Sequence, residues 1–237
     1  MDIGTAFTYM MEDENIMMKV LIGGIIILVA QSTSMFLVGI PLVFLYYGYW
    51  LQTMTQVRDG QAIPLPEWGN WGELFSKGGM VLVITLIYNL PILLIACCMF
   101  GLAIPGMFAP GDMQEAVGAF VGIMGLCLSC VSIIVIFVVN LMVPAALIRF
   151  AQTGQFNSAF EFKEILAFIR NNFSDYLIMF VVIWAANFIA SFGIILCGIG
   201  QAFTGFWALL VSAHLNGQLA TKMNGGSATP DIAPVGF

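Results

Sequence analysis

Residues 177–219 read LIMFVVIWAANFIASFGIILCGIGQAFTGFWALLVSAHLNGQL, a stretch without Asp, Glu, Lys or Arg in which His214 is the one basic side chain. A membrane-spanning helix needs about 20 predominantly apolar residues, so the stretch is long enough for two. Gly198-Ile199-Gly200-Gln201 can make a tight turn between residues 177–197 and 202–222. The stretch therefore predicts an antiparallel pair of spanning helices.

The composition of the whole chain points the same way. Of its 237 residues, 60% are hydrophobic and 8% are charged, whereas a soluble domain averages about 45–50% apolar and about 25% charged residues. The net charge is −6, and the seven Lys and Arg residues make no basic stripe, which argues against nucleic-acid binding. The first 14 residues carry four acids and no base, so they lack the positive start of a cleaved signal peptide. We expect an all-α integral membrane protein that keeps its first apolar segment.

Three further apolar runs lie at residues 20–50, 80–111 and 117–148. The last two predict spans at residues 78–103 and 117–150, because the Pro- and Gly-containing segment 104–115 between them reads as a loop. The first run is interrupted by Gln31-Ser32-Thr33-Ser34. It fits either one long tilted helix or a hairpin of helices 15–31 and 35–52.

The distribution of basic residues bears on this choice, because cytoplasmic loops are enriched in Lys and Arg. With a hairpin the chain crosses six times and the cytoplasmic side holds every base: Lys19, Arg58, Lys77, Arg149, Lys163, Arg170 and Lys222. With a single helix it crosses five times and Lys19 lies outside. We favour a bundle of about six spans in the plasma membrane with both termini cytoplasmic, and keep five as the alternative. A single transmembrane domain, residues 1–222, would precede a flexible cytoplasmic tail, residues 223–237.

Short amphipathic segments come before three of the runs. Residues 159–170 carry Phe162, Ile165, Leu166 and Ile169 at helical spacing. Residues 66–76 carry Trp68 and Trp71, which suit the aromatic belt of a membrane, and residues 6–11 form a weaker third segment. Such segments lie in the headgroup plane with the apolar face in lipid. The chain thus predicts an internal repeat of three units, each an interfacial helix followed by a helical hairpin.

A set of short motifs runs along almost the whole chain. In order they are Lys19 with Ile22-Gly23-Gly24, Gly48-Tyr49, Arg58-Asp59-Gly60, Leu65-Pro66-Glu67-Trp68, Glu73-Leu74-Phe75 with Lys77-Gly78, Tyr88-Asn89-Leu90-Pro91, Pro144-Ala145-Ala146-Leu147, Ala159-Phe160, Asp175-Tyr176-Leu177 and Ala213-His214-Leu215-Asn216-Gly217-Gln218. With these motifs, residues 2–221 resemble the prokaryotic membrane family called domain of unknown function 4013. The chain departs from the family pattern at Gln31–Ser34, where such sequences place a proline. The resemblance implies a membrane location and a topology but no reaction. It marks as structural Gly48, Gly60, Leu65, Pro66, Trp68, Gly78, Pro91, Pro144, Gly154, Phe160, Tyr176, His214 and Gly217.

Candidate sites within the spans are few. His214 is a weak candidate ligand for a cofactor, but a lone His lacks the partners of a zinc site and more simply bonds a neighbouring helix. Five Cys lie inside apolar runs, where a thiol packs as a small hydrophobe. Polar residues such as Asn89, Asn140 and Asn187 can line a path, although they more often hydrogen-bond between helices. The glycines in the runs favour close helix packing; they are Gly23, Gly24, Gly118, Gly122, Gly125, Gly193 and Gly205.

We expect no catalytic residue, no metal and no cofactor, because no Asp, Glu, Lys or Arg lies deep in a span. Residues that can contact anionic lipid headgroups are Arg58, Trp68, Trp71, Lys77, Arg149, Lys163 and Arg170. The sequence thus favours a non-catalytic structural or accessory subunit of a membrane complex, or a lipid-interacting protein. Its partners would be membrane lipids and other membrane subunits or further copies of itself. The alternative is a passive carrier or channel for a small or lipidic molecule.

Overall fold

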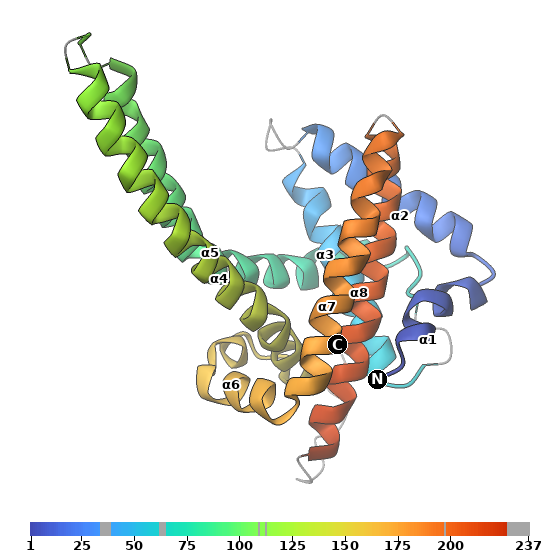
Figure 1. The fold of residues 1–237 in the computed structure, drawn as a ribbon. Coiled ribbons are helices and arrows are strands. Elements are labelled where there is room, and N and C mark those ends of the chain that lie inside the picture. The colour runs from blue at the N-terminus through green and yellow to red at the C-terminus, as the bar shows by residue number, and fades with distance from the viewer. Residues whose placement is uncertain (34–38, 62–64, 109, 112, 197, 227–237) are drawn as a thin grey trace. The chain divides into compact units, whose positions relative to one another are not determined.

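The computed structural model describes residues 1–33, 39–61, 65–108, 110–111, 113–196 and 198–226, and within them the chain forms helices and connecting turns, with no strand. The all-α prediction is confirmed for this part of the chain (Figure 1). The chain divides into two compact units, one of residues 1–82 and 145–237, the other of residues 83–144. We describe each unit by itself.

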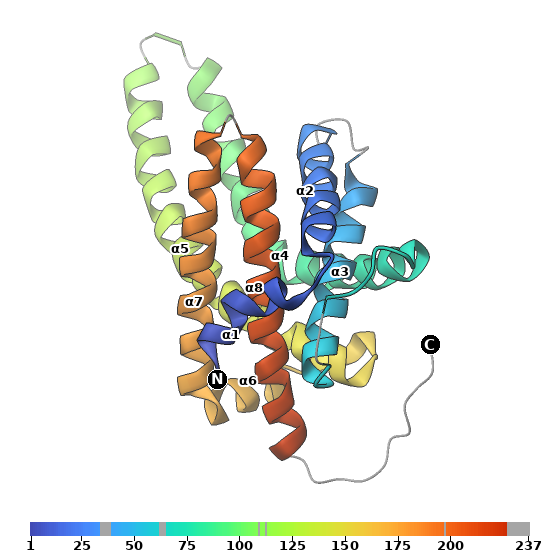
Figure 2. The same cartoon turned by 90° about the vertical axis from the view of Figure 1, so that its right-hand side faces the viewer.

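The first unit is built around α8 (Ile199–Gly226), which packs against α2 (Ile16–Thr33), α3 (Ile40–Arg58) and α7 (Phe173–Ser191). Figure 2 shows α8 between α7 and α2. Many α8 side chains between Ala202 and Ala220 are buried, among them Phe206, Leu210, Leu215 and Leu219. A central helix that is apolar on several faces is the expected core of such a bundle.

The first apolar run is two helices. α2 ends at Thr33, α3 begins at Ile40, and the two helices contact each other. The alternative of one long tilted helix over residues 20–50 is therefore wrong. The predicted turn at Ser32–Ser34 comes too early, because Ser32 and Thr33 are still helical, and Ser34 lies outside the described residues.

The second paired stretch also differs in detail from its prediction. α7 ends at Ser191 and a short 3-10 helix, η4 (Phe192–Ile195), follows it. α8 then begins at Ile199, directly after Gly198, whose φ of +79° suits glycine. The turn between the helices therefore lies earlier than the predicted Gly198–Gln201.

The N-terminal segment packs on protein. It forms α1 (Ile3–Thr8) and the 3-10 helix η1 (Tyr9–Glu12), and α1 contacts α8. Asp2 caps α1, and the hydrogen bonds that it accepts from Thr5 lower the pKa of its carboxyl. Tyr9 is buried and donates its hydroxyl to the Leu210 carbonyl oxygen, 3.1 Å away.

The other two predicted interfacial segments behave differently from each other. Residues 66–76 are not a separate helix, because α4 (Trp71–Phe108) begins inside them. Residues 159–170 divide into the 3-10 helix η3 (Phe156–Phe160) and α6 (Phe162–Asn171). Ile165 and Ile169 of α6 are buried in the protein itself, so part of the predicted lipid-facing stripe has a protein partner.

The second unit consists of the distal part of α4 and most of α5 (Gln114–Thr153). Both helices extend into the predicted loop 104–115, since α4 ends at Phe108 and α5 begins at Gln114. Exposed apolar side chains cover this unit, including Leu86, Leu94, Phe100, Phe120, Ile123, Leu126, Ile133, Ile134 and Phe137. Such surfaces suit lipid or another membrane subunit.

Four helical stretches in the described residues are long and apolar enough to span a membrane: Ile16–Thr33, Trp71–Ile104, Gln114–Thr153 and Phe173–Ile195. These stretches make the chain a multi-pass membrane protein by length and composition. The helices α3 and α8 are not among them; both carry several polar side chains.

Candidate functional site

A buried ionic cluster lies where α2 begins; we call it the Lys19 cluster. The Lys19 ammonium contacts Asp13 Oδ2 at 2.7 Å, Glu67 Oε1 at 2.7 Å and the Leu65 carbonyl oxygen at 3.0 Å. Lys19 and Asp13 are only 3% and 5% exposed. Three acceptors meet the three N–H donors of the ammonium, which offsets the cost of removing both charges from water.

Aromatic side chains cover the Lys19 cluster. Trp68 donates its indole N–H to the Lys19 carbonyl oxygen at 3.1 Å, and its ring stacks on Tyr49 at 4.2 Å between centroids. Tyr49 donates its hydroxyl to the Pro66 carbonyl oxygen at 3.0 Å. Family-motif residues from three segments thus meet in one place. From the sequence, Lys19 was a topology signal and a family-motif residue but not the centre of an ion cluster. Its position in the first turn of an apolar helix, soon after Asp13, was the available clue.

Most of the basic residues predicted at the headgroups have partners. Arg149 pairs with Glu161 at 2.6 Å. Arg58 pairs with Asp59 and also donates to the Ala151 carbonyl oxygen.

Two lysines also form ion pairs. Lys77 pairs with Glu73 one turn earlier on α4, and Lys222 pairs with Asp175. Among these contacts, Arg58 links the end of α3 to the end of α5, Arg149 links α5 to the start of α6, and Lys222 links α8 to the start of α7.

The exposed face of α6 is the exception. Lys163 and Arg170 are exposed and form no ion pair with any residue in the described part of the chain. They lie seven residues apart, hence on one face of the helix, with Leu166, 63% exposed, between them. Trp71, also predicted at the headgroups, is 44% exposed.

His214 lies in a packed position. Its ring is 6% exposed, stacks on Tyr9 at 4.3 Å between centroids, and its Nδ1 is 3.1 Å from Gln218 Nε2. Burial raises the pKa of Tyr9 well above its usual value. Among the described residues, no group of three or more His, Cys, Asp or Glu gathers near enough to hold a metal ion.

The polar groups inside the spans bond to their own helices. Asn89, Asn140 and Asn187 each donate the side-chain amide to the carbonyl oxygen four residues earlier, and Ser129 and Ser132 do the same. For the side-chain N–H groups of Asn89, Asn140 and Asn187, the prediction of hydrogen bonds between helices is therefore wrong. Thr204 of α8, which the sequence had not singled out, makes such a link to the Ala190 carbonyl oxygen of α7.

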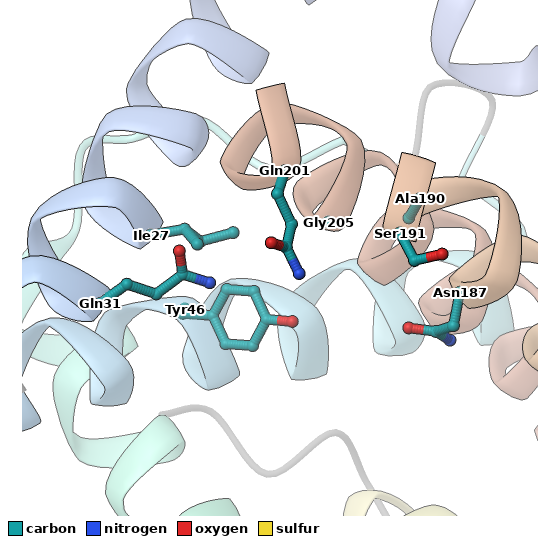
Figure 3. A pocket seen from close by; sticks show the side chains of 8 residues that line it. All are labelled: Ile27, Gln31, Tyr46, Asn187, Ala190, Ser191, Gln201 and Gly205. Atoms are coloured by element: carbon teal, nitrogen blue, oxygen red, sulfur yellow. The ribbon is translucent and has the colours of Figure 1, made fainter. Parts of the chain in front are cut away.

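A cavity of about 150 Å³ opens among α2, α3, α7 and α8; we call it the polar cavity. Its lining residues are Ile27, Gln31, Tyr46, Asn187, Ala190, Ser191, Gln201 and Gly205. Figure 3 shows Gln201 and Tyr46 extending into the space between Gln31 and Asn187. Asn187 was predicted as a possible path residue, whereas Gln31 was predicted at a helix end, Gln201 in a turn, and Tyr46 was not singled out. Only the packing of four helices brings them together.

The family-motif glycines mark close helix crossings. A Cβ at Gly48 would overlap the Leu74 carbonyl group, and one at Gly78 would overlap the Phe44 carbonyl group, so α3 and α4 touch through backbone there. A Cβ at Gly217 of α8 would lie 2.5 Å from Val57 Cβ and 2.7 Å from the Met54 carbonyl oxygen, so α8 also approaches α3 closely. Gly60 and Gly154 instead follow the ends of α3 and α5 with φ of +72° and +66°, which is the usual role of a helix-ending glycine.

Close packing fails at other glycines. A Cβ at Gly118, Gly122, Gly125 or Gly205 would meet nothing within 4 Å, so the prediction of close packing is wrong there. The prediction is confirmed at Gly23, Gly24 and Gly193, where a Cβ would lie within 2.4 Å of the side chains of Phe206, Phe203 and Thr204, respectively. The described cysteines differ likewise from expectation. Cys97, Cys98, Cys127 and Cys130 are exposed rather than packed within the chain, and Cys197 lies outside the described residues.

Other motif residues have local packing roles. Tyr176 accepts a hydrogen bond at its hydroxyl from the backbone N–H of Ala145, 3.2 Å away and next to Pro144. Pro144 lies inside α5 and interrupts its hydrogen bonding. Phe160 contacts Phe156 at 5.2 Å between ring centroids, and Pro91 lies within α4.

Comparison with known proteins gives a family and no activity. No curated protein and no solved structure matches the chain. One family, described as "Protein of unknown function (DUF4013)", matches residues 32–199. That range holds most of the motif residues, including Gly48, Trp68 and Gly78, whereas Lys19 and His214 lie outside it. Because the match extends over more than half of its length, the chain belongs to this family of proteins of unknown function.

Proposed function

We propose that the protein is a non-catalytic, lipid-interacting membrane protein that binds anionic headgroups through α6. The observation that supports this is the exposed face of α6, where Lys163 and Arg170 flank Leu166. A cation near an anionic leaflet contributes about 1 kcal/mol of attraction, and a neighbouring apolar side chain can enter the headgroup region. The buried face of α6 holds this arrangement in place through Ile165, Phe168 and Ile169.

The test is lipid selectivity in bilayers of phosphatidylcholine mixed with phosphatidylglycerol. Spin-labelled lipids report the relative association of each lipid with the protein. For the double variant Lys163→Gln/Arg170→Gln we expect the preference for phosphatidylglycerol to weaken by up to about 2 kcal/mol, since two cations are lost. The matched control is Lys77→Gln, which removes a cation already paired with Glu73. Equal losses in both variants, or none in either, would refute the role of α6.

The proposed setting is the plasma membrane, with the protein as an accessory subunit of a larger complex. The exposed apolar side chains of α4 and α5 in the second unit support this setting. Gentle solubilisation followed by native mass spectrometry tests it, and we expect a second copy or another membrane subunit to remain bound. A bare monomer under conditions that preserve bound lipid would contradict the accessory role.

A second candidate function is passive carriage of a small molecule, and the polar cavity is the observation that favours it. Carriage requires that the small molecule first bind at the polar cavity. If no small molecule binds there, the protein is not such a carrier.

A further inference from the structure

We propose that the polar cavity is a binding site for a small, neutral, hydroxyl-rich group. This proposal is independent of the lipid contact assigned to α6. The two share no residue, and α6 lies just before the start of α7, whereas the cavity lies at the end of α7. The cavity lies near the end of α2 at Gln31, the end of α7 at Ser191 and the start of α8 at Gln201.

The lining provides hydrogen-bonding capacity without charge. The Asn187 amide nitrogen is occupied by the Ile183 carbonyl oxygen, which leaves its oxygen as an acceptor facing the cavity. Ser191 donates to the Phe188 carbonyl oxygen, so its lone pairs can also accept. The Tyr46 hydroxyl and the Gln201 amide have no hydrogen-bond partner in the described residues, and both can donate and accept.

The absence of Asp, Glu, Lys, Arg and His from the eight lining residues selects a neutral ligand. A charged group in a site that apolar residues help to form needs an opposite charge to offset its desolvation. Hydroxyl groups suit the site because each can donate to Asn187 or Ser191 while accepting from Gln201 or Tyr46. The volume of about 150 Å³ is below the roughly 300–1,000 Å³ of drug-sized sites, so the bound group is small.

This chemistry has two sources, a free polyol or the glycerol moiety of a neutral lipid. Ligand-observed NMR on the full chain in phosphatidylcholine nanodiscs distinguishes them, with glycerol and a monoacylglycerol as probes. Binding of glycerol identifies a free polyol as sufficient, whereas binding of the monoacylglycerol alone identifies the lipid source. Glycerol 3-phosphate is the charged comparison, and we expect it to bind at least about tenfold more weakly than the neutral probe.

Two variants remove polar groups from the cavity, and a third serves as the control. We expect Asn187→Leu and Gln201→Leu to weaken binding at least about tenfold, while Asn140→Leu leaves it unchanged. Asn140 is matched to Asn187, because each donates to the carbonyl four residues earlier on its own helix, but Asn140 is not part of the cavity lining. Tyr46→Phe removes a single oxygen atom and replaces the leucine variants if these fail to fold.

Three results would overturn the proposal. The first is that neither neutral probe binds the unmodified protein. The second is that Asn140→Leu weakens binding as much as the cavity variants do. The third is that glycerol 3-phosphate binds as tightly as the neutral probes.

Discussion

At the scale of single residues, Lys19 combines a charge with a nearly complete loss of solvent contact. It lies in the first turn of α2, is 3% exposed, and holds Asp13 and the backbone of residue 65 in the same cluster. Its partners come from sequence positions before and well after it. The residue therefore fastens the N-terminal segment and the 65–68 segment to α2.

Replacing Lys19 with Met leaves the Asp13 carboxylate buried without its cation. We expect a loss of stability near the lower end of about 3–5 kcal/mol, because the other carboxylate, Glu67, has a 75% exposed side chain and can turn to solvent. Thermal unfolding in detergent, calibrated with denaturant, measures the change. The control Lys77→Met breaks a half-buried pair one turn apart on α4 and should cost about 0–1 kcal/mol. The cluster would have no such role if Lys19→Met cost no more than the control.

At the scale of helices, two crossings of α3 depend on glycine. Gly48 and Gly78 allow α3 and α4 to touch through backbone atoms, and Gly217 allows α8 to approach α3. Close approach of this kind is the usual function of small residues between membrane helices. The amphipathic pattern of α6 acts at the same scale, since one face packs on protein and the other carries the exposed Lys163 and Arg170.

The Gly48→Ala substitution should separate α3 from α4. The added methyl group would overlap the Leu74 carbonyl, which is backbone and cannot turn away, so we expect a loss of about 1–3 kcal/mol or more. Gly122→Ala is the control, because its methyl group meets nothing and Ala favours a helix by about 1 kcal/mol over Gly. Thermal unfolding of both variants should therefore shift in opposite directions. A stabilising Gly48→Ala would contradict the crossing.

At the scale of the whole molecule, contacts within the first unit bring both ends of the described chain to one side of that unit. The Asp2 backbone N–H donates to Gln218 Oε1 at 2.8 Å, and the terminal amine lies 4.0 Å from Asp175. An even number of crossings places both ends on one side of a membrane. These contacts favour an even number of crossings over five, and six spans with cytoplasmic termini stay a prediction.

Reporter fusions test that topology in living cells. A reporter joined before Met1 and one joined after Gly226 should both report the cytoplasm. A reporter inserted after Gly111, between α4 and α5, should report the opposite side and serves as the control. Opposite locations for the two terminal reporters would rule out six spans.

The sequence by itself determined the properties that depend on neighbouring residues. Long apolar runs without charge predict membrane helices wherever they occur, and Gly60 and Gly154 mark the ends of α3 and α5 because only local backbone conformation is involved. The pairing of Arg149 with Glu161 was also within reach, since the two lie close in the sequence. The resemblance to the family, carried by short motifs, was likewise confirmed.

Only the tertiary structure decided which faces meet. Tyr46 and Gln201 line one cavity although 155 positions separate them, and periodicity holds no information on such pairs. The sequence pattern also could not predict which face of α6 is buried in protein or which glycines lie against a neighbouring helix. The reason is that lipid and protein interiors select the same apolar side chains. The Lys19 cluster followed the same rule: a charge in an apolar segment predicts a partner, and only the packed chain shows that the partner includes Glu67.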